Sequence, residues 1–436
     1  MRTLNRSHFA RTVLLSAAAP AEGKNIGLIR KRLTQSHDML NVGRLKPIYQ
    51  SPESPSGKLI LLREGIRAED QSTWTPALTE IVTENLASIR PFTLRMTYDD
   101  WSMNDILHAV IPEDLHEEIP AGFAQVGHVA HVNIREQYLP YRHLIGQILL
   151  DKNTNLKTVI NKLEDVGTES IFRTFPYEVL AGPDDLNVVV SHNDCTFRFN
   201  FGKVYWNTRL NTEHTRIMDK FKEGDAVCDV MAGVGPFAVP SGKRRVFVWA
   251  NDLNPDSYRA MQDAVTLNRV DKFVQPFCLD GREFIRKSAK DLLRLQRTAT
   301  ITAKTPSRSE VKKPNPKAQT KVLQEPATFD HYVMNLPASA VEFLDAFKGL
   351  YTGHEHLFAP ERGRKLPMVH VYLFSVNELD PVKESQACCD IVSRHLGHNI
   401  RPKTSEVEVF DVRLVSPKKK MFCVSFRLPP DVAFSK

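Results

Sequence analysis

Two short segments of the chain combine glycine, aspartate and apolar residues at a spacing that suits nucleotide binding. Residues 229–237 read D-V-M-A-G-V-G-P-F, and residues 249–255 read W-A-N-D-L-N-P. Each begins in or follows an apolar run, so we expect a strand, a glycine turn that opens a helix, and a second strand that ends at an acidic residue. Asp252 lies 19 residues after Gly233, close to the gap at which such a carboxylate binds a ribose diol.

The glycine turn leaves the choice of nucleotide open. A dinucleotide fingerprint has the pattern G-x-G-x-x-G; here Gly233 and Gly235 fill the first two positions, and Ala238, a permitted variant, fills the third. Pro236 lies where a first helical turn tolerates proline, because its missing N–H would have no partner there. A glycine turn without a strong phosphate signature suits S-adenosyl-L-methionine, which has a ribose and an adenine but no phosphate. NAD, and a βα turn of some other α/β protein, remain as alternatives.

Two polar motifs follow later apolar runs. Ligands of open α/β sheets bind at the carboxyl ends of the strands, so we expect both motifs to lie near a bound ligand. Asp280-Gly281 follows the expected third strand. The Asp can accept a hydrogen bond from the adenine amino group, and the Gly lets the backbone come close. Asn335-Leu336-Pro337 follows the expected fourth strand, and an amide there offers a donor and an acceptor to a base edge facing the methyl group. The alternatives are an ordinary β-to-α turn and an Asn helix cap.

The segment Tyr205–His214 gathers aromatic, cationic and acidic groups just before the expected nucleotide domain. Exposed aromatic rings beside arginine suit base stacking and phosphate contact, which makes Trp206 and Arg209 candidate substrate contacts. In the alternative interpretation the aromatic residues pack in a linker, and Glu213 forms a helical surface pair with Arg216. Spacing alone favours this second interpretation.

These residues need a sheet to position them, and from Gly224 the chain alternates apolar runs with helix-compatible segments. We expect a hairpin near the C-terminus, made of residues 407–415, a turn at 416–420 and residues 421–428. The final strand should therefore run antiparallel on an otherwise parallel sheet. That ending is typical of methyltransferase sheets and favours S-adenosyl-L-methionine over NAD. The predicted fold class is α/β: a Rossmann-like class I methyltransferase sheet with an antiparallel C-terminal strand, preceded by α+β substrate-binding domains. The parallel strands are expected at Ala226–Val230, Val246–Ala250, Phe273–Cys278, Tyr332–Met334 and Val369–Phe374.

The length of the chain allows for several domains. Residues 1–48 are basic and hydroxylated, without an acidic residue before Glu22, so we expect a mitochondrial transit peptide or a disordered basic tail. Small α+β domains at 49–120 and 121–223 and a nucleotide-binding domain at 224–436 follow. Residues 298–325, rich in Lys, Thr, Pro and Ser, are expected to form a disordered basic insertion. Within the α+β domains we expect strands at Leu59–Leu62, Phe92–Met96, Val126–Ile134, Asn187–Val190 and Thr196–Phe201, and helices at Thr75–Ile89 and Tyr141–Leu150.

The formal net charge of +7 is unevenly distributed. Residues 1–48 hold nine Lys/Arg and two Asp/Glu, and residues 286–325 hold eleven and three, so the remainder is net acidic. RNA binding would therefore use local patches or the two basic segments.

Other function classes find little support. No run of 18 apolar residues exists, so no membrane span is predicted. The six cysteines form no C-x-x-C pair and mostly fall inside apolar runs, as buried free thiols of a reducing compartment do. His128 and His131 have no third ligand nearby, so we expect them to be structural and predict no metal site.

Eight ordered motifs resemble those of the archaeal/eukaryotic tRNA (guanine-37-N1) methyltransferases, in a eukaryotic, fungal-like form. The resemblance runs from about Trp101 to the C-terminus, leaving out 298–325, and residues 1–100 add little to it. Because all eight occur in the family's order, the match is highly specific. The motifs are Gly127-His-Val-Ala-His-Val-Asn133, Leu139-Pro-Tyr-Arg-His-Leu-Ile-Gly146, Asp151-Lys-Asn153, Phe172-Arg-Thr-Phe175, Glu178-Val-Leu-Ala-Gly182, Val204–His214, Asp229–Phe237 and Asn251–Pro255.

The resemblance implies methyl transfer from S-adenosyl-L-methionine to N1 of the guanine 3′ to the anticodon. Glu213 matches the family's general base, which would take the N1 proton. Arg173 matches its catalytic arginine, which would stabilise charge on guanine O6. Tyr205 matches a conformationally important aromatic residue, and Asn335 the Asn of an Asn-Pro-Pro motif, which would hold N1 in line with the methyl group.

The resemblance also implies the binding residues. Leu336 replaces the first proline of Asn-Pro-Pro, which makes that loop less rigid, and some relatives carry Arg at the position of His214. The expected cofactor contacts are His214, Gly233, Gly235, Asp252, Leu253, Asp280, Gly281 and Asn335; the expected substrate contacts are Arg142, Trp206 and Arg209.

Three rival functions remain at this point. A wybutosine-pathway aminocarboxypropyl transferase shares cofactor and fold, but its chemistry needs no N1 base. An RNA-binding homologue without catalysis is disfavoured by intact Glu213, Asn335 and Asp252. A dehydrogenase is disfavoured by the C-terminal hairpin. The expected partner is the anticodon stem-loop of tRNA, with no membrane association, for a monomer in the mitochondrial matrix, nucleus and cytoplasm.

Overall fold

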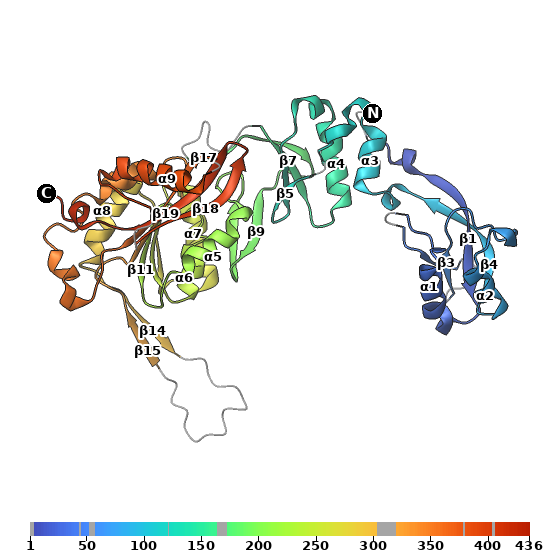
Figure 1. Cartoon of the computed structure of the whole chain (residues 1–436), viewed down its shortest axis with the longest axis horizontal. Coiled ribbons are helices and arrows are strands. Elements are labelled where there is room, and N and C mark those ends of the chain that lie inside the picture. Colours follow the sequence, from blue (N-terminus) through green and yellow to red (C-terminus); the bar gives the residue numbers. More distant parts are fainter. Residues whose placement is uncertain are drawn as a thin grey trace, which may run out of the picture. The chain divides into compact units, whose positions relative to one another are not determined.

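The computed structural model describes residues 4–42, 45–51, 57–120, 122–163, 172–302, 320–377, 380–402 and 406–436. The chain divides into two compact units (Figure 1). The N-terminal unit comprises residues 1–125, 130–162 and 178–184, and the C-terminal unit comprises 126–129, 163–177 and 185–436.

The N-terminal unit begins with a four-stranded antiparallel sheet in the order β2-β3-β1-β4. Its long central strand, β1, pairs with β4 along its whole length, from Arg11 opposite Met96 to Pro20 opposite Ala87. Apolar side chains of the sheet pack against two helices, with Ala18, Ile29 and Ile81 fully buried between them. The elements are β1 (Arg11–Pro20), α1 (Ile26–Gln35), β2 (Ile48–Gln50), β3 (Lys58–Leu61), α2 (Pro76–Thr83) and β4 (Ala87–Met96).

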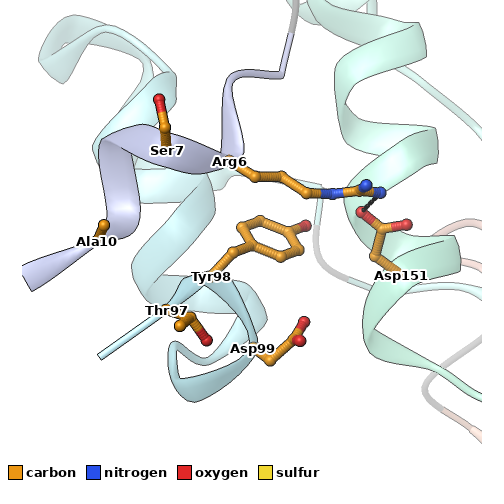
Figure 2. A pocket seen from close by; sticks show the side chains of 7 residues that line it. All are labelled: Arg6, Ser7, Ala10, Thr97, Tyr98, Asp99 and Asp151. Atoms are coloured by element: carbon orange, nitrogen blue, oxygen red, sulfur yellow. Dashed lines mark hydrogen bonds and ion pairs between the residues drawn. The ribbon is translucent and has the colours of Figure 1, made fainter. Parts of the chain in front are cut away.

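The expectation of a disordered segment at 1–48 is therefore wrong. Its basic composition is real, but the apolar run from Val13 to Ala19 forms β1, whose residues Leu15–Ala18 are buried. The segment before it is anchored too: the indole N–H of Trp101 donates to the Phe9 carbonyl at 2.8 Å. Figure 2 shows Arg6 reaching over Tyr98 to Asp151, an ion pair of 2.8 Å.

The rest of this unit contains helices α3 (Met103–Val110) and α4 (Arg142–Lys152) and a sheet in the order β5-β6-β7-β8. The predicted helix at 141–150 is confirmed, whereas the one at 75–89 ends at Thr83, because Asn85 takes a positive φ of 56° and the chain turns into β4. The strand predicted at 126–134 is two short strands, separated at Gly127 with φ of 57°. The strands are β5 (Ala124–Val126), β6 (Val129–Val132), β7 (Thr158–Lys162) and β8 (Tyr177–Ala181).

The C-terminal unit contains a seven-stranded sheet in the order β13-β12-β11-β16-β17-β19-β18. Its strands β11, β17, β18 and β19 are labelled in Figure 1. The first five strands are parallel, and β19 runs antiparallel to both β17 and β18. Each predicted strand and the terminal hairpin are confirmed, and with them the Rossmann-like fold class. The strands are β11 (Ala226–Asp229), β12 (Phe247–Asn251), β13 (Val274–Phe277), β16 (His331–Met334), β17 (Met368–Val376), β18 (Val407–Ser416) and β19 (Lys419–Arg427).

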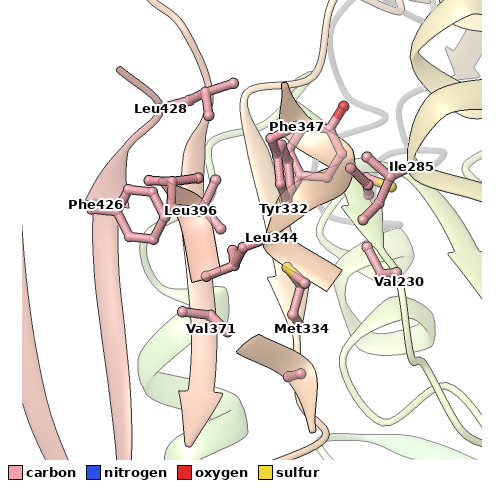
Figure 3. Packing of buried hydrophobic residues seen from close by; sticks show 14 of the residues in the cluster. Val230, Ile285, Tyr332, Met334, Leu344, Phe347, Val371, Leu396, Phe426 and Leu428 are labelled. Carbon is pink, nitrogen blue, oxygen red and sulfur yellow. The ribbon is translucent and has the colours of Figure 1, made fainter. Parts of the chain in front are cut away.

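Alternation along the strands sends side chains to two opposite faces of this sheet. On one face Tyr332, Met334 and Val371 pack with Phe347 and Leu396 in a continuous apolar core (Figure 3). This face is covered by α8 (Gly281–Leu292), the 3-10 segment η8 (Ala340–Phe347) and α9 (Pro381–Leu396). The remaining helices of the unit are α5 (Asn211–Met218), α6 (Ala238–Lys243), α7 (Pro255–Asn268) and α10 (Pro430–Ala433).

The domain boundary predicted at 223/224 is wrong, because residues 185–223 belong to the C-terminal unit. They form the hairpin β9 (Asn187–His192) and β10 (Cys195–Asn200), then the 3-10 segment η7 (Thr208–Leu210) and α5. Asn268 of α7 exchanges two hydrogen bonds with the backbone of Thr196, at 2.9 and 2.8 Å, and Asn254 donates to the Lys203 carbonyl at 2.8 Å. These bonds tie the hairpin to the helices of the large sheet.

The disordered insertion predicted at 298–325 is also corrected at its ends. Residues Thr298–Thr302 (β14) and Thr320–Gln324 (β15) pair as an antiparallel hairpin, and residues 303–319 lie outside the described residues. The base of the hairpin is anchored by Glu325, which is buried and accepts hydrogen bonds from Trp249 Nε1 and Arg297.

The short 3-10 segments mostly connect larger elements. In the described part of the chain, no helix has the length and apolarity that a membrane crossing requires. Five of the cysteines are buried and Cys278 is exposed; all are free. Besides η7 and η8, the segments are η1 (Arg6–Phe9), η2 (Gly23–Asn25), η3 (Gln71–Thr73), η4 (Tyr98–Asp100), η5 (Glu113–Glu118), η6 (Glu136–Tyr141), η9 (Glu355–Phe358) and η10 (Pro360–Arg362).

Candidate functional site

A cavity opens where the parallel strands β11, β12, β13 and β16 end, entirely within the C-terminal unit. The cavity, counted together with the open solvent at its mouth, has a volume of about 690 Å³. Ligands of open α/β sheets bind at this edge because the loops there diverge. The lining residues are Phe172, Arg173, Tyr205, Val230, Met231, Gly233, Asn251, Asp252, Leu253, Asn254, Ser257, Leu279, Asp280, Gly281, Asn335, Leu336 and Phe343.

The glycine turn after β11 forms one wall of the cavity. Gly233 has φ of 58°, and a Cβ atom added to it would meet no atom within 4 Å, so the backbone is open to a ligand. Its N–H donates to Asp252 Oδ2 at 2.8 Å, and the N–H of Ala232 donates to the Asn251 carbonyl at 2.7 Å. These two bonds fix the turn against the end of β12.

Two carboxylates stand at the cavity with acceptor sites to spare. Asp252 accepts from Gly233 and, through Oδ1, from the Asn254 N–H at 2.9 Å, and burial raises its pKa above the usual range. Asp280 caps α8, because its Oδ1 accepts from the N–H groups of Arg282 and Glu283 at 2.9 and 3.3 Å. Since each carboxylate oxygen accepts up to two bonds, both side chains can still bind a ligand.

A third carboxylate lies beneath the turn. Asp229, at the end of β11, is fully buried, and among the described residues neither of its oxygens has a hydrogen-bond partner. Burial and, secondarily, the nearby Asp252 raise the pKa of Asp229 well above its usual range. The neutral, protonated form of this side chain is therefore favoured.

The far wall is built by the loop after β16 and by η8. Asn335 and Leu336 line the cavity, and the Phe374 N–H donates to the Pro337 carbonyl at 3.2 Å, which fixes the loop to β17. Gly281 faces Phe343 so closely that a Cβ atom would lie 2.9 Å from the ring. Only glycine therefore fits between α8 and this wall.

Arg173 and Tyr205 also line the cavity, and both precede the large sheet in the sequence. The Arg173 guanidinium lies over the Tyr205 ring, 4.3 Å from its centroid, and Asn207 Nδ2 donates to the Tyr205 hydroxyl at 3.2 Å. Arg173 has φ of 57°, a conformation that few non-glycine residues adopt. Such strain is frequent where a side chain is aimed at a ligand.

The cavity fits S-adenosyl-L-methionine on four counts. The open glycine turn gives the ligand access to backbone, and Asp252 is an acceptor for a ribose diol beside it. Asp280 has a free oxygen for an adenine amino group, and Leu253 and Phe343 supply apolar wall for a ring.

Two residues expected at the reaction centre lie outside this lining. Glu213 is buried on α5 and accepts two hydrogen bonds from Arg216 and one from Tyr372. His214 is buried as well; its Nδ1 lies 3.0 Å from His192 Nε2, and burial lowers the pKa of His214 to about 3. Neutral His214 thus connects α5 to the β9–β10 hairpin.

The expected substrate contacts belong to both compact units. Trp206 packs against Phe197 and Phe199, with ring centroids 5.5 and 5.2 Å away, so the packing interpretation describes it better than base stacking. Arg142 belongs to the N-terminal unit and pairs with Glu178 at 2.8 Å. Arg209 is exposed and forms no ion pair within the described ranges. Gly235, with φ of 91°, shapes the turn without lining the cavity.

Sequence reasoning missed Arg413 on β18. Helix α5 lies along this strand, because Lys220 and Arg216 both contact Glu408, at 2.6 and 3.4 Å. Arg209, in η7 just before α5, is close enough to Arg413 for its charge to act on that guanidinium. Burial and the charge of Arg209 lower the pKa of Arg413. No motif marks Arg413, because only the packing of α5 on β18 brings it to this place.

Two family matches cover most of the chain beyond the first sheet. Residues 103–185 match the TYW2 N-terminal domain, and residues 188–301 match the TRM5/TYW2 methyltransferase domain. The transition between them coincides with the boundary near residue 185 between the two compact units.

Full-length relatives are similar along their whole chains. A tRNA (guanine(37)-N(1))-methyltransferase of Aspergillus fumigatus is 51% identical over 452 residues, covering 100% of this chain and 94% of its own. One of Schizosaccharomyces pombe is 43% identical, covering 100% of this chain and 96% of its own.

Solved structures share the fold. Trm5b from Pyrococcus abyssi aligns with a TM-score of 0.56 at 20% identity, over 95% of this chain and 99% of that one. The structure of aTrm5 in complex with tRNALeu aligns with a TM-score of 0.60 at 18% identity, over 95% of this chain and 100% of that one.

Proposed function

Because the chain belongs to the tRNA (guanine(37)-N(1))-methyltransferase family, we propose that it methylates N1 of guanosine 37, next to the anticodon, using S-adenosyl-L-methionine. The observation that carries the proposal is the composition of one cavity. Asp252 and Asp280 suit an adenosyl group, while Asn335, Arg173 and Tyr205 line the same cavity and suit a base.

The chemistry divides between donor and protein. When bound, S-adenosyl-L-methionine supplies an electrophilic methyl group on a sulfonium centre. Guanine N1 carries a proton and is a poor nucleophile at neutral pH, so the protein must remove that proton as the N1–carbon bond forms. A carboxylate within hydrogen-bond reach can accept it, and we assign this role to Glu213.

Glu213 is buried and is not among the residues that line the cavity. Catalytic hydrogen bonds are often long or incomplete before substrate binds, so this placement is compatible with the role. The target base must leave the anticodon-loop stack to react, at a cost of roughly a few kcal/mol for a single-stranded loop.

Arg173 and Asn335 have complementary tasks in the cavity. Loss of the N1 proton moves negative charge onto guanine O6, and a guanidinium that is already held in place stabilises it without reorganisation. The Asn335 amide has a donor and an acceptor, so it can hold the base edge in one orientation.

Arg209 and Arg413 are proposed contacts to the RNA backbone. Within the described ranges neither arginine has a carboxylate partner, whereas neighbouring Arg216 and Lys220 share Glu408. Burial and the charge of Arg209 lower the pKa of Arg413. Two uncompensated cations close to one another favour an anionic ligand such as phosphate.

We further propose a monomer that works in the mitochondrial matrix, nucleus and cytoplasm. The basic N-terminal segment supports import of part of the pool. Because β1 is the centre of a sheet, an imported chain would have to keep residues 11–20.

The test is to incubate the protein with S-adenosyl-L-methionine and unmodified tRNA, digest the RNA, and map the product by mass spectrometry. One added methyl mass on the nucleotide at position 37 is expected. The mass of an aminocarboxypropyl group there, or a methyl group at another position, would refute the assignment. The Glu213→Gln variant should bind both ligands but lose turnover; wild-type turnover would rule out Glu213 as the base.

A further inference from the structure

The carboxylate of Glu213 is enclosed by donors from two different elements. Arg216, one turn further along α5, donates from Nε to Oε2 at 2.6 Å and from Nη2 to Oε1 at 2.7 Å. Tyr372 of β17 donates its hydroxyl proton to Oε1 at 2.7 Å, across 159 residues of sequence. Glu213 keeps 4% of its surface exposed.

These bonds leave one part of the carboxylate unused. Oε1 accepts two hydrogen bonds and Oε2 accepts one, so Oε2 retains an acceptor site. The two parallel bonds from Arg216 fix the plane of the carboxylate, as fork-like Arg–carboxylate pairs do. Glu213 is therefore oriented and able to take one more proton-donating partner.

Arg216 is itself immobilised. Its guanidinium lies over the Phe410 ring of β18, 3.8 Å from the centroid, and its Nη1 lies 3.4 Å from Glu408 Oε1. Glu408 is also held by Lys220 at 2.6 Å. Releasing Glu213 from this arrangement would leave the half-buried Arg216 with only the longer contact to Glu408, which is costly.

Tyr372 connects the carboxylate to the elements that form the cavity. On β17 the residues Val371 and Leu373 face the apolar core, so Tyr372 faces the opposite side, toward α5. Its ring also lies near that of Phe237, which ends the glycine-turn motif, with centroids 6.5 Å apart. The hydroxyl is fully buried, and burial raises the pKa of Tyr372 well above its usual range, so it remains a donor.

We propose that Tyr372 and Arg216 are positioning residues for methyl transfer: they hold Glu213 so that Oε2 is the atom that receives the guanine N1 proton. This rests on the proposed function, in which Glu213 is the general base. Cys423 of β19 also faces the carboxylate; its pKa is raised by burial to about 12, so the neutral thiol adds no charge. Guanine moves to the carboxylate, and the hydrogen bonds from Tyr372 and Arg216 to Glu213 stay in place.

Tyr372→Phe is the sharpest test, because it removes one hydroxyl and keeps the ring in the sheet. We expect the single-turnover rate of methyl transfer to fall by about tenfold, as loss of a hydrogen bond to a charged group does, with KM for S-adenosyl-L-methionine and tRNA affinity unchanged. The matched control is Tyr332→Phe on β16, whose buried hydroxyl lies 3.3 Å from that of Tyr351 and does not contact Glu213. It should react at the wild-type rate.

A double-mutant cycle separates positioning from a general loss of packing. In the Glu213→Gln background, Tyr372→Phe should change the residual rate less than twofold, because the hydroxyl acts through the carboxylate. The same loss in both backgrounds, or a wild-type rate for Tyr372→Phe alone, would overturn the proposal. Arg216→Lys keeps the charge but not the paired bonds, and its loss should likewise vanish in the Glu213→Gln background.

Different results would refute Glu213 as the base and Tyr372 and Arg216 as its positioning residues. If Glu213→Gln itself turns over at the wild-type rate, the base assignment is wrong. If that variant is inactive while Tyr372→Phe and Arg216→Lys react normally, Glu213 remains the base, and only the positioning role of Tyr372 and Arg216 is refuted.

Discussion

The guanidinium of Arg173 lies over the ring of Tyr205, 4.3 Å from its centroid, and both side chains line the same cavity. Arg173 comes from the segment before β8, and Tyr205 from the loop between β10 and η7. The backbone of Arg173 is in the left-handed region, so the side chain is aimed by a local conformation that costs free energy. The aromatic ring is what holds the cation at the cavity.

Replacing the Tyr205 ring should therefore act through Arg173. Tyr205→Leu removes a cation–π contact worth roughly 0.5–2 kcal/mol, so we expect the single-turnover rate to fall about two- to thirtyfold. Tyr205→Phe keeps the ring and loses only the bond from Asn207, so it should stay near the wild-type rate. Equal losses in the two variants would mean that the hydroxyl, and not the ring, is what matters.

Arg413 should contribute to RNA affinity rather than to the chemical step. Arg413→Ala removes a cation that has no carboxylate partner in the described ranges, and we expect tRNA affinity to fall while the single-turnover rate at saturation is kept. The dependence of log K on log salt should flatten by about one unit of slope for a lost phosphate contact.

The control for Arg413 is Arg244→Ala. Arg244 is another arginine of the C-terminal unit; it is exposed and pairs with Asp219 at 2.7 Å, so its charge is compensated. Filter binding across a salt series should show no change of slope for Arg244→Ala. An unchanged slope for Arg413→Ala as well would remove Arg413 from the RNA-binding surface.

The buried histidine pair should make the C-terminal unit sensitive to acid. Burial lowers the pKa of His214 to about 3, below its ordinary value, so between those two values the unfolded chain binds a proton that the folded chain does not. The free energy of unfolding should therefore fall by about 1.4 kcal/mol per pH unit as the pH drops below about 6.5.

His214→Asn tests that source of acid sensitivity. Asn places a polar atom near the position of Nδ1, which contacts His192, but it does not titrate. Urea unfolding at pH 7 and pH 5 should show a pH-dependent loss that is smaller than wild type by up to about 2 kcal/mol. If His214→Asn lowered the free energy of unfolding equally at pH 7 and pH 5, so that its pH-dependent loss matched that of the wild type, the assignment to His214 would be contradicted.

The N-terminal strand should be indispensable to the first sheet. Ala18 is fully buried between β1 and the helices, so Ala18→Glu places a charge in the core and should destabilise this sheet by several kcal/mol, roughly 3 or more. Leu14→Glu is the control on the same strand, because Leu14 is 81% exposed. Limited proteolysis should cleave residues 4–96 readily in the first variant and slowly in the second.

The large sheet could be predicted because its signals are local. The apolar runs at 226–230 and 246–250 and the polar residues that end them identify strands and their carboxyl ends directly. Since parallel strands align these ends at one edge, Asp252, Asp280 and Asn335 could be expected in one cavity, as the structure has them.

The N-terminal segment was misjudged for an equally physical reason. Its net basic charge and lack of early acidic residues are typical of tails, but β1 is stabilised by pairing with β4, some 70 residues away, which no local pattern reports. The boundary near 185 was missed similarly, because the hairpin β9–β10 joins the C-terminal unit through Asn268.

The sequence by itself determined the donor side of this protein: a glycine turn, two aspartates and an Asn at the ends of four parallel strands. Only the tertiary structure decided the surroundings of Glu213. The spacing alone suggested an exposed i, i+3 pair with Arg216. That pair exists, but its carboxylate is buried and also accepts a hydrogen bond from Tyr372 of β17. The reason is that helix spacing reports neighbours on one helix, whereas the packing of α5 on the sheet decides which distant side chains reach the carboxylate.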